Sequence, residues 1–151
     1  MHGGPAFTHN YMLPLKLLAR KGYPVIFYDQ AGCGSSFIPK NLDEFPQLLT
    51  IKYYVREAHT IVAALKLEQY FVYGSSWGSI LAQEFAISRP KGLIGMVLDG
   101  ALCDSQLYIK SQWEDVLSEL PTFTQQKLRK LEDSGKHLSP EYKSIESSLS
   151  S

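Results

Sequence analysis

Residues 74–78 read Gly-Ser-Ser-Trp-Gly, and the serine at the centre of this pattern is a candidate nucleophile. An apolar run at residues 69–73 predicts a strand before it, and a helical pattern follows at residues 77–89. A G-x-S-x-G pattern between a strand and a helix places its serine on a sharp turn, with the hydroxyl clear of the backbone. At a helix N-terminus, free N–H groups also favour negative charge near Ser76. The pattern predicts nucleophilic attack on a carbonyl, with an ordinary Gly/Ser turn as the alternative.

A second group of residues with possible chemistry begins the sequence, which reads Met-His-Gly-Gly-Pro. Acyl transfer needs N–H donors for the oxygen that becomes negative, usually one after the nucleophile and one from a distant loop. Adjacent glycines allow backbone conformations that turn N–H groups toward such an oxygen. We therefore expect Trp77 to supply one donor and Gly4, together with Gly3, to supply the other. Without the serine motif, these glycines would indicate only a Gly-Pro turn.

Asp29 and Gln30 end a buried run at residues 23–28, which predicts a further strand, and Ala-Gly-Cys-Gly-Ser-Ser follows them. A carboxylate at a strand end can accept hydrogen bonds from N–H groups of the next loop. Turn chemistry of this kind predicts a structural role for Asp29, with a catalytic role as the alternative. We also expect His2 to brace the glycine loop through hydrogen bonds.

The three motifs occur in the order His-Gly-Gly-Pro, Asp-Gln-x-Gly-Cys-Gly-x-Ser and Gly-Ser-Ser-Trp-Gly. In this order and at these separations they resemble the proline iminopeptidase branch of the α/β-hydrolases, and within it the aminopeptidases similar to the tricorn-interacting factor. The resemblance is strong over residues 1–100 and weaker beyond them. Ala31 departs from the pattern, because many members have arginine after the Asp-Gln pair. This departure leaves the fine substrate specificity open.

The resemblance implies a serine hydrolase that releases an N-terminal residue, proline or another neutral residue, from short peptides or amino-acid amides. Ser76 would be the nucleophile, and the oxyanion hole would be formed by Gly3, Gly4 and Trp77. No metal or cofactor is implied. Because family members are much longer, we expect a fragment that lacks the acid and the histidine of a Ser…Asp…His triad and is itself inactive. An esterase or another small-molecule hydrolase on the same fold is the alternative function.

The histidines of the sequence do not occupy the expected place of a general base, which the family pattern puts in a loop after the last strand. They are His2, His9, His59 and His137. Asp99 ends a strand predicted at residues 93–98, and strand ends are where such folds place catalytic carboxylates. Asp99 is therefore a candidate stand-in for the acid, on the basis of its position alone.

Helical and strand patterns alternate up to residue 100, which is typical of an α/β fold with a parallel sheet and helices on both faces. Helices are predicted over residues 9–21, with Leu13, Leu17 and Leu18 as the apolar stripe, and over residues 50–66. Residues 37–49 are predicted to form a loop. From residue 101 only helices are predicted, and they cover residues 105–120, 123–134 and 139–149. We expect a partial α/β-hydrolase core at residues 1–100 and the first part of a helical cap at residues 101–151.

Charge and cysteine content narrow the class of protein further. The sequence has 15 basic and 15 acidic residues, so net charge indicates neither nucleic acid nor an anionic membrane as a partner. No apolar run reaches the length of a membrane span. Cys33 and Cys103 have no metal-ligand spacing and favour a reducing, cytoplasmic setting over a disulfide scaffold. The oligomeric state cannot be read from the sequence.

Overall fold

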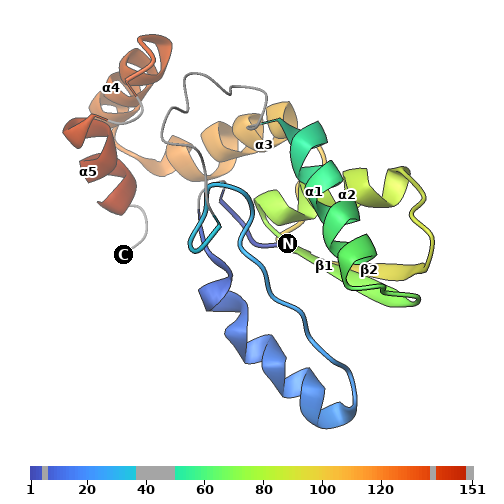
Figure 1. Ribbon diagram of the computed structural model, residues 1–151. Coiled ribbons are helices and arrows are strands. Elements are labelled where there is room, and N and C mark those ends of the chain that lie inside the picture. Colours follow the sequence, from blue (N-terminus) through green and yellow to red (C-terminus); the bar gives the residue numbers. More distant parts are fainter. Residues whose placement is uncertain (5–6, 37–49, 137–138, 149–151) are drawn as a thin grey trace. The chain divides into compact units, whose positions relative to one another are not determined.

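The structure is a computed structural model, which describes residues 1–4, 7–36, 50–136 and 139–148 (Figure 1). Contacts within the chain divide it into two compact units, Met1–Cys103 and Asp104–Ser151. The interpretation of the second unit as part of a cap stays a prediction. The loop predicted at residues 37–49 and the histidine at position 137 lie outside the described residues.

Two parallel strands form the sheet of the first unit, and both are rich in apolar and aromatic residues that favour strands. They are β1 (Tyr70–Ser75) and β2 (Leu93–Asp99). Their register pairs Phe71 with Gly95 and Ser75 with Asp99, so the two carboxyl ends lie side by side. The strands predicted at residues 69–73 and 93–98 are therefore confirmed, and they bring Ser75 and Asp99 to one end of the sheet.

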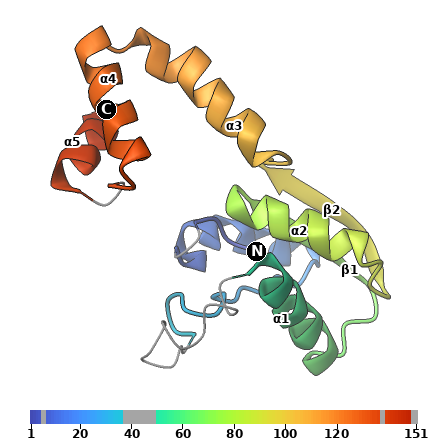
Figure 2. The ribbon, with the colours of Figure 1, turned by 90° about the horizontal axis from the view of Figure 1, so that it is seen from above.

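Two α-helices complete the core of this unit, in agreement with the helical patterns of the sequence. They are α1 (Ile51–Ala64) and α2 (Trp77–Ile87). Helix α2 packs against both strands and α1 packs against α2, as Figure 2 shows from above. The apolar side chains of α2 that are buried most completely are Leu81, Ala82 and Phe85. The short connections from β1 to α2 and from α2 to β2 fix where the strand ends lie.

Residues 23–28 do not form a strand, contrary to the prediction. The segment is extended, but no strand among the described residues pairs with it. Instead, Met1 binds the carboxyl end of β1, and His2 binds Gln30, which follows the extended segment. The Met1 amine donates to the carbonyl oxygen of Tyr73 (2.6 Å), Ser75 N–H donates to the Met1 carbonyl oxygen (3.2 Å), and the Gln30 side-chain amide donates to the His2 carbonyl oxygen (2.8 Å). A strand needs a hydrogen-bonded neighbour along its whole length. Met1 and His2 lie near only one end of the extended segment.

The helix predicted at residues 9–21 is present as η1 (His9–Lys21), which has the tighter 3-10 geometry. Pro14 lies inside it, where its missing N–H and its ring are incompatible with regular α-helical bonding. The predicted apolar stripe does not face a core. The residues of this stripe, with exposed fractions of 38, 53 and 47%, are Leu13, Leu17 and Leu18. Only Met12 of η1 is buried, and no described helix or strand makes an extensive contact with η1.

The second unit consists of helices, as predicted, but its first helix is broken into three. Its elements are α3 (Ser105–Ser111), the π-helical turn η4 (Gln112–Val116), the 3-10 turn η5 (Leu117–Glu119), α4 (Thr122–Asp133) and α5 (Pro140–Ser148). The guanidinium of Arg129 lies 3.9 Å from the ring centroid of Trp113. Lys127 and Glu141 join α4 to α5 through an ion pair. Among the helices of the described residues, none combines the length and apolar character needed to cross a bilayer.

Candidate active site

Ser76 occupies the turn between β1 and α2, and its backbone has an unusual conformation. Its φ is 50° and its ψ is −119°, in a region that residues other than glycine rarely adopt. The Ser76 N–H donates to the Asp99 carbonyl oxygen, and the Ser79 N–H donates to the Ser76 carbonyl oxygen, both at 2.8 Å. Lys66 and Arg89 also have positive φ, but they follow helix ends, where left-handed residues are common. Strain of this kind concentrates at functional sites, and the Ser76 side chain is exposed.

Gly74 and Gly78 flank this turn because the backbone of three segments meets there. A Cβ on Gly74 would overlap the Gly78 carbonyl oxygen and lie 2.8 Å from the Cβ of Ala82. A Cβ on Gly78 would overlap the carbonyl oxygen of Met1 and lie 2.6 Å from that of His2. Backbone atoms cannot move aside as a flexible side chain can. Both positions therefore require glycine, and they hold β1, α2 and the N-terminal segment in contact.

The glycine loop lies beside Ser76. A Cβ built on Gly3 would be 3.2 Å from the Cβ of Ser76 and 3.2 Å from the hydroxyl oxygen of Tyr11. The Gly3 N–H donates to this hydroxyl at 2.7 Å, so the structure does not support Gly3 as an oxyanion donor. Gly4 has a φ of 127°, which is open to glycine and strained for other residues. Gly4 stays the proposed donor from this loop.

A buried hydrogen-bonded network joins the three motifs of the sequence. His2 and Gln30 are each only 1% exposed. The Gln30 N–H donates to His2 Nε2 (3.0 Å), which assigns the ring proton to Nδ1, and Nδ1 donates to the Gly3 carbonyl oxygen (2.9 Å). Burial lowers the pKa of His2, which keeps the ring neutral. The Trp77 indole N–H donates to the Gln30 side-chain oxygen (3.2 Å), which links the glycine loop to the first residue of α2.

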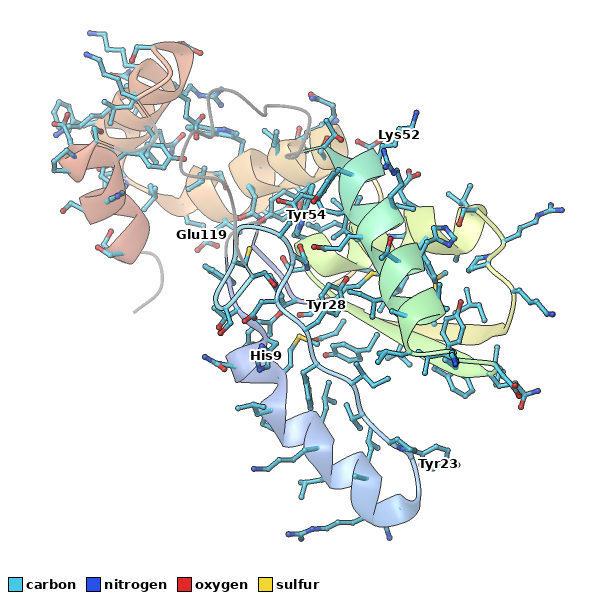
Figure 3. All side chains as sticks on the ribbon, viewed as in Figure 1. His9, Tyr23, Tyr28, Lys52, Tyr54 and Glu119 are labelled. Carbon is cyan, nitrogen blue, oxygen red and sulfur yellow. The ribbon has the colours of Figure 1, made fainter. Side chains whose placement is uncertain are left out.

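Asp29 organises the loop that follows it and also holds the start of η1. Its carboxylate accepts hydrogen bonds from the Ser35 N–H (3.0 Å), the His9 N–H (3.0 Å) and His9 Nδ1 (2.7 Å); Figure 3 shows His9 at the beginning of η1. Burial alone would raise the pKa of Asp29, but these hydrogen bonds outweigh it and hold the pKa at about 2. A Cβ on Gly34 would overlap the carboxylate.

Asp99 lies next to the serine turn at the end of β2. Its carboxylate accepts hydrogen bonds from the Tyr73 hydroxyl (2.6 Å) and from Ser75 Oγ (3.3 Å). Burial and the hydrogen bond to Asp99 raise the pKa of Tyr73 to about 12. These contacts join Asp99 to β1, just before Ser76 in the sequence.

The family model of the alpha/beta hydrolase fold matches residues 1–134, which is most of the chain. This chain belongs to the α/β-hydrolase family. The fold class expected from the motifs is therefore confirmed, and the serine turn of this α/β-hydrolase chain lies in the strand–turn–helix context of that fold.

Several curated proteins are similar to this α/β-hydrolase chain. It is 36% identical to a proline iminopeptidase of Thermoplasma volcanium over 143 residues, which are 94% of this chain and 46% of the relative. It is 34% identical to a proline iminopeptidase of Lactobacillus delbrueckii subsp. lactis over 144 residues, 94% of this chain and 48% of the relative. The chain thus spans about half the length of the curated relatives it matches.

Solved structures show the same similarity. The crystal structure of VinJ matches with a TM-score of 0.79 and 31% identity, over 93% of this α/β-hydrolase chain and 47% of VinJ. A proline iminopeptidase-related protein from Thermus thermophilus matches with a TM-score of 0.55 and 24% identity, over 65% of this chain and 34% of that one. The second match supports the fold alone.

No described residue of the α/β-hydrolase chain acts as a hydrogen-bond partner of Ser76 Oγ, so the described part contains no evident base. His2 is bonded on both ring nitrogens. His59 Nε2 lies 2.8 Å from Ser88 Oγ, and this hydroxyl already donates to the Phe85 carbonyl oxygen (2.6 Å). His59 is therefore the donor in that pair. His9 has the arrangement of a histidine oriented by a carboxylate, but its partner is Asp29.

Sequence reasoning overlooked two sets of contacts in this α/β-hydrolase chain. Glu57 accepts a hydrogen bond from the Ala31 N–H (2.8 Å) and Tyr54 donates to the Ala31 carbonyl oxygen (3.3 Å), so α1 holds the Asp-Gln loop. The other is the Tyr11 hydroxyl on Gly3. No local pattern marks these residues, because each forms a hydrogen bond to a segment that is distant in the sequence or lies across a turn. Among the described residues, no cluster of His, Cys, Asp or Glu could hold a metal ion.

Proposed function

We propose that this chain carries the nucleophile and the oxyanion hole of a serine hydrolase that removes an N-terminal residue from short peptides or amino-acid amides. The conformation of Ser76 carries the proposal, because a strained turn at a helix N-terminus exposes a hydroxyl next to N–H donors. The similarity to proline iminopeptidases supports the choice of a peptidase over an esterase.

In this reaction Ser76 Oγ attacks the carbonyl carbon, and the negative charge moves to the carbonyl oxygen. Trp77 is the first residue of α2, so its N–H has no acceptor within the helix and is available to that oxygen. Gly4 N–H would be the second donor. No described residue takes the proton from Ser76, and a serine without a base is a weak nucleophile at neutral pH. We therefore also propose that the chain alone is a poor peptidase.

Fluorophosphonate labelling with peptide mapping tests the nucleophile. We expect a single adduct on Ser76 and its loss in Ser76→Ala. Ser75→Ala is the matched control, because Ser75 is one position away, is buried and bonds to Asp99. Labelling that persists in Ser76→Ala would reject Ser76 as the nucleophile. Comparing aminoacyl-naphthylamides with short acyl esters, in a form that turns over substrate, separates the peptidase from the esterase.

A further inference from the structure

The hydroxyl of Tyr11 lies at the glycine loop, close to the proposed nucleophile. The Gly3 N–H donates to it at 2.7 Å. The Tyr11 hydroxyl oxygen and the Cβ of Ser76 both lie 3.2 Å from the position that a Cβ on Gly3 would take. The two atoms are therefore separated by no more than twice that distance, which places the Tyr11 hydroxyl near the proposed nucleophile.

The proton of this hydroxyl is available for a ligand. A phenol has one O–H donor and also accepts hydrogen bonds. Tyr11 uses its oxygen to accept the Gly3 N–H, and its proton is donated to no described residue. The hydroxyl of Tyr73 differs, because it donates to Asp99 at 2.6 Å. Tyr11 is 49% exposed, so it is not enclosed by the core.

We propose that the Tyr11 hydroxyl donates a hydrogen bond to the substrate's carbonyl oxygen, as a third donor beside Gly4 and Trp77. This inference rests on Ser76 being the nucleophile. When Ser76 Oγ bonds to the carbonyl carbon, the π electron pair moves to the oxygen and the serine proton leaves to a base or to water. The carbonyl then re-forms and the leaving group departs with its bonding pair. Tyr11 keeps its proton throughout and stabilises the charged oxygen.

The bond from Gly3 makes Tyr11 a better donor. A hydroxyl that accepts one hydrogen bond is polarised and donates the next more strongly. The same bond directs the Gly3 N–H away from the substrate, so the phenol replaces it at the oxygen. A purely structural Tyr11, which only holds Gly3 in place, is the competing role, and there the oxygen acts solely as an acceptor.

The rate at which p-nitrophenyl acetate acylates Ser76 tests the proposal, because an activated ester depends little on a general base. The chain is reacted at neutral pH and the adduct is located by peptide mass mapping. Tyr11→Phe should acylate about tenfold more slowly or worse. The control is Tyr23→Phe, whose ring is 62% exposed and lies near the other end of η1 from His9 (Figure 3). It should match the unsubstituted chain, and circular dichroism should be the same for all three.

Replacing Tyr11 by 3-fluorotyrosine separates a donor from an acceptor while keeping the hydroxyl. Fluorine makes the phenol a stronger donor and a weaker acceptor, so the proposal expects acylation as fast as with tyrosine or faster. Slower acylation, or an unchanged rate in Tyr11→Phe, would overturn the donor role while Ser76 stays the nucleophile. If the unsubstituted chain carries no adduct on Ser76, the proposed function fails and this inference fails with it.

Discussion

Side chains around the carboxyl ends of β1 and β2 are buried and hydrogen-bonded, whereas apolar side chains elsewhere on the same strands are exposed. At the carboxyl ends, Ser75, Ser79 and Gln30 are at most 7% exposed and take part in hydrogen bonds. Along the strands, the apolar side chains of Phe71 and Val97 are 61% and 53% exposed.

The difference shows that the serine turn is held by contacts among the motif residues themselves. The Gln30 side chain binds His2 and Trp77, and Gly74 and Gly78 allow β1, α2 and the N-terminal segment to meet closely. The faces and edges of a sheet have no such internal partners, and they are stabilised only by whatever further element packs against them. A site can therefore be held at one end of a sheet although side chains elsewhere on its strands, such as Phe71 and Val97, are more than half exposed.

The largest effect is expected from Gly78→Ala. The new Cβ would overlap the carbonyl oxygen of Met1 and crowd that of His2, and neither backbone atom can move without displacing the glycine loop. We expect a loss of about 3 kcal/mol or more in the free energy of unfolding, together with loss of Ser76 labelling. Denaturant titration and fluorophosphonate labelling measure the two effects.

Gly95→Ala is the matched control on the open part of the sheet. Its Cβ would meet only the exposed Phe71 ring, at 3.3 Å, and this ring can move aside. We expect a change within about 1 kcal/mol and normal labelling. Equal costs at Gly78 and Gly95 would contradict the difference between the two regions.

Gly4→Ala should weaken the oxyanion hole while the fold persists. An alanine is strained at a φ of 127°, and the N–H of residue 4 would shift from its position. Loss of one donor costs about 2.7–4 kcal/mol of barrier, or a hundredfold or more in the acylation rate. Gly22→Ala imposes similar strain at a φ of 85° without any neighbour within 4 Å, and should leave that rate unchanged. A near-normal rate in Gly4→Ala would make the loop merely structural.

The carboxylate of Asp29 predicts a loss of stability in acid. Its pKa is about 2 in the folded chain and 3.8 for an ordinary aspartate, so the folded state favours the ionised form. Its contribution, on the order of 2 kcal/mol, is present above pH 4 and is lost as the pH falls from about 4 to 2. Asp29→Asn should remove this part of the pH dependence in denaturant titrations, whereas the exposed Asp133→Asn should retain it. The same acid loss in both variants would exclude Asp29 as its source.

The smallest effect concerns the two edges of β1, whose N–H groups alternate in direction. Tyr70 and Ser76 donate toward β2, so Val72 and Gly74 do as well, while Phe71 and Tyr73 face the edge where Met1 ends. We expect amide exchange at least about tenfold slower at the first pair than at the second. Uniform protection along β1 would show that its outer edge is covered after all.

Local patterns in the sequence identified the parts of this molecule that local physics governs. Apolar runs gave β1 and β2, helical spacing gave α1 and α2, and the serine pattern located the strained turn at Ser76. The prediction failed at residues 23–28 and at the leucine face of η1. Both have the composition of buried elements, but burial requires a neighbour, and composition does not reveal whether one is present.

The sequence by itself determined the α/β class, the order of its elements and the position of the candidate nucleophile, because these depend on residue types within a few positions. Only the tertiary structure decided which groups face Ser76. The Gly3 N–H was expected there, but the Tyr11 hydroxyl accepts it and lies beside the site instead. The direction of an N–H depends on the backbone dihedrals of its loop and on the acceptor it meets, and both are set by packing between segments distant in sequence.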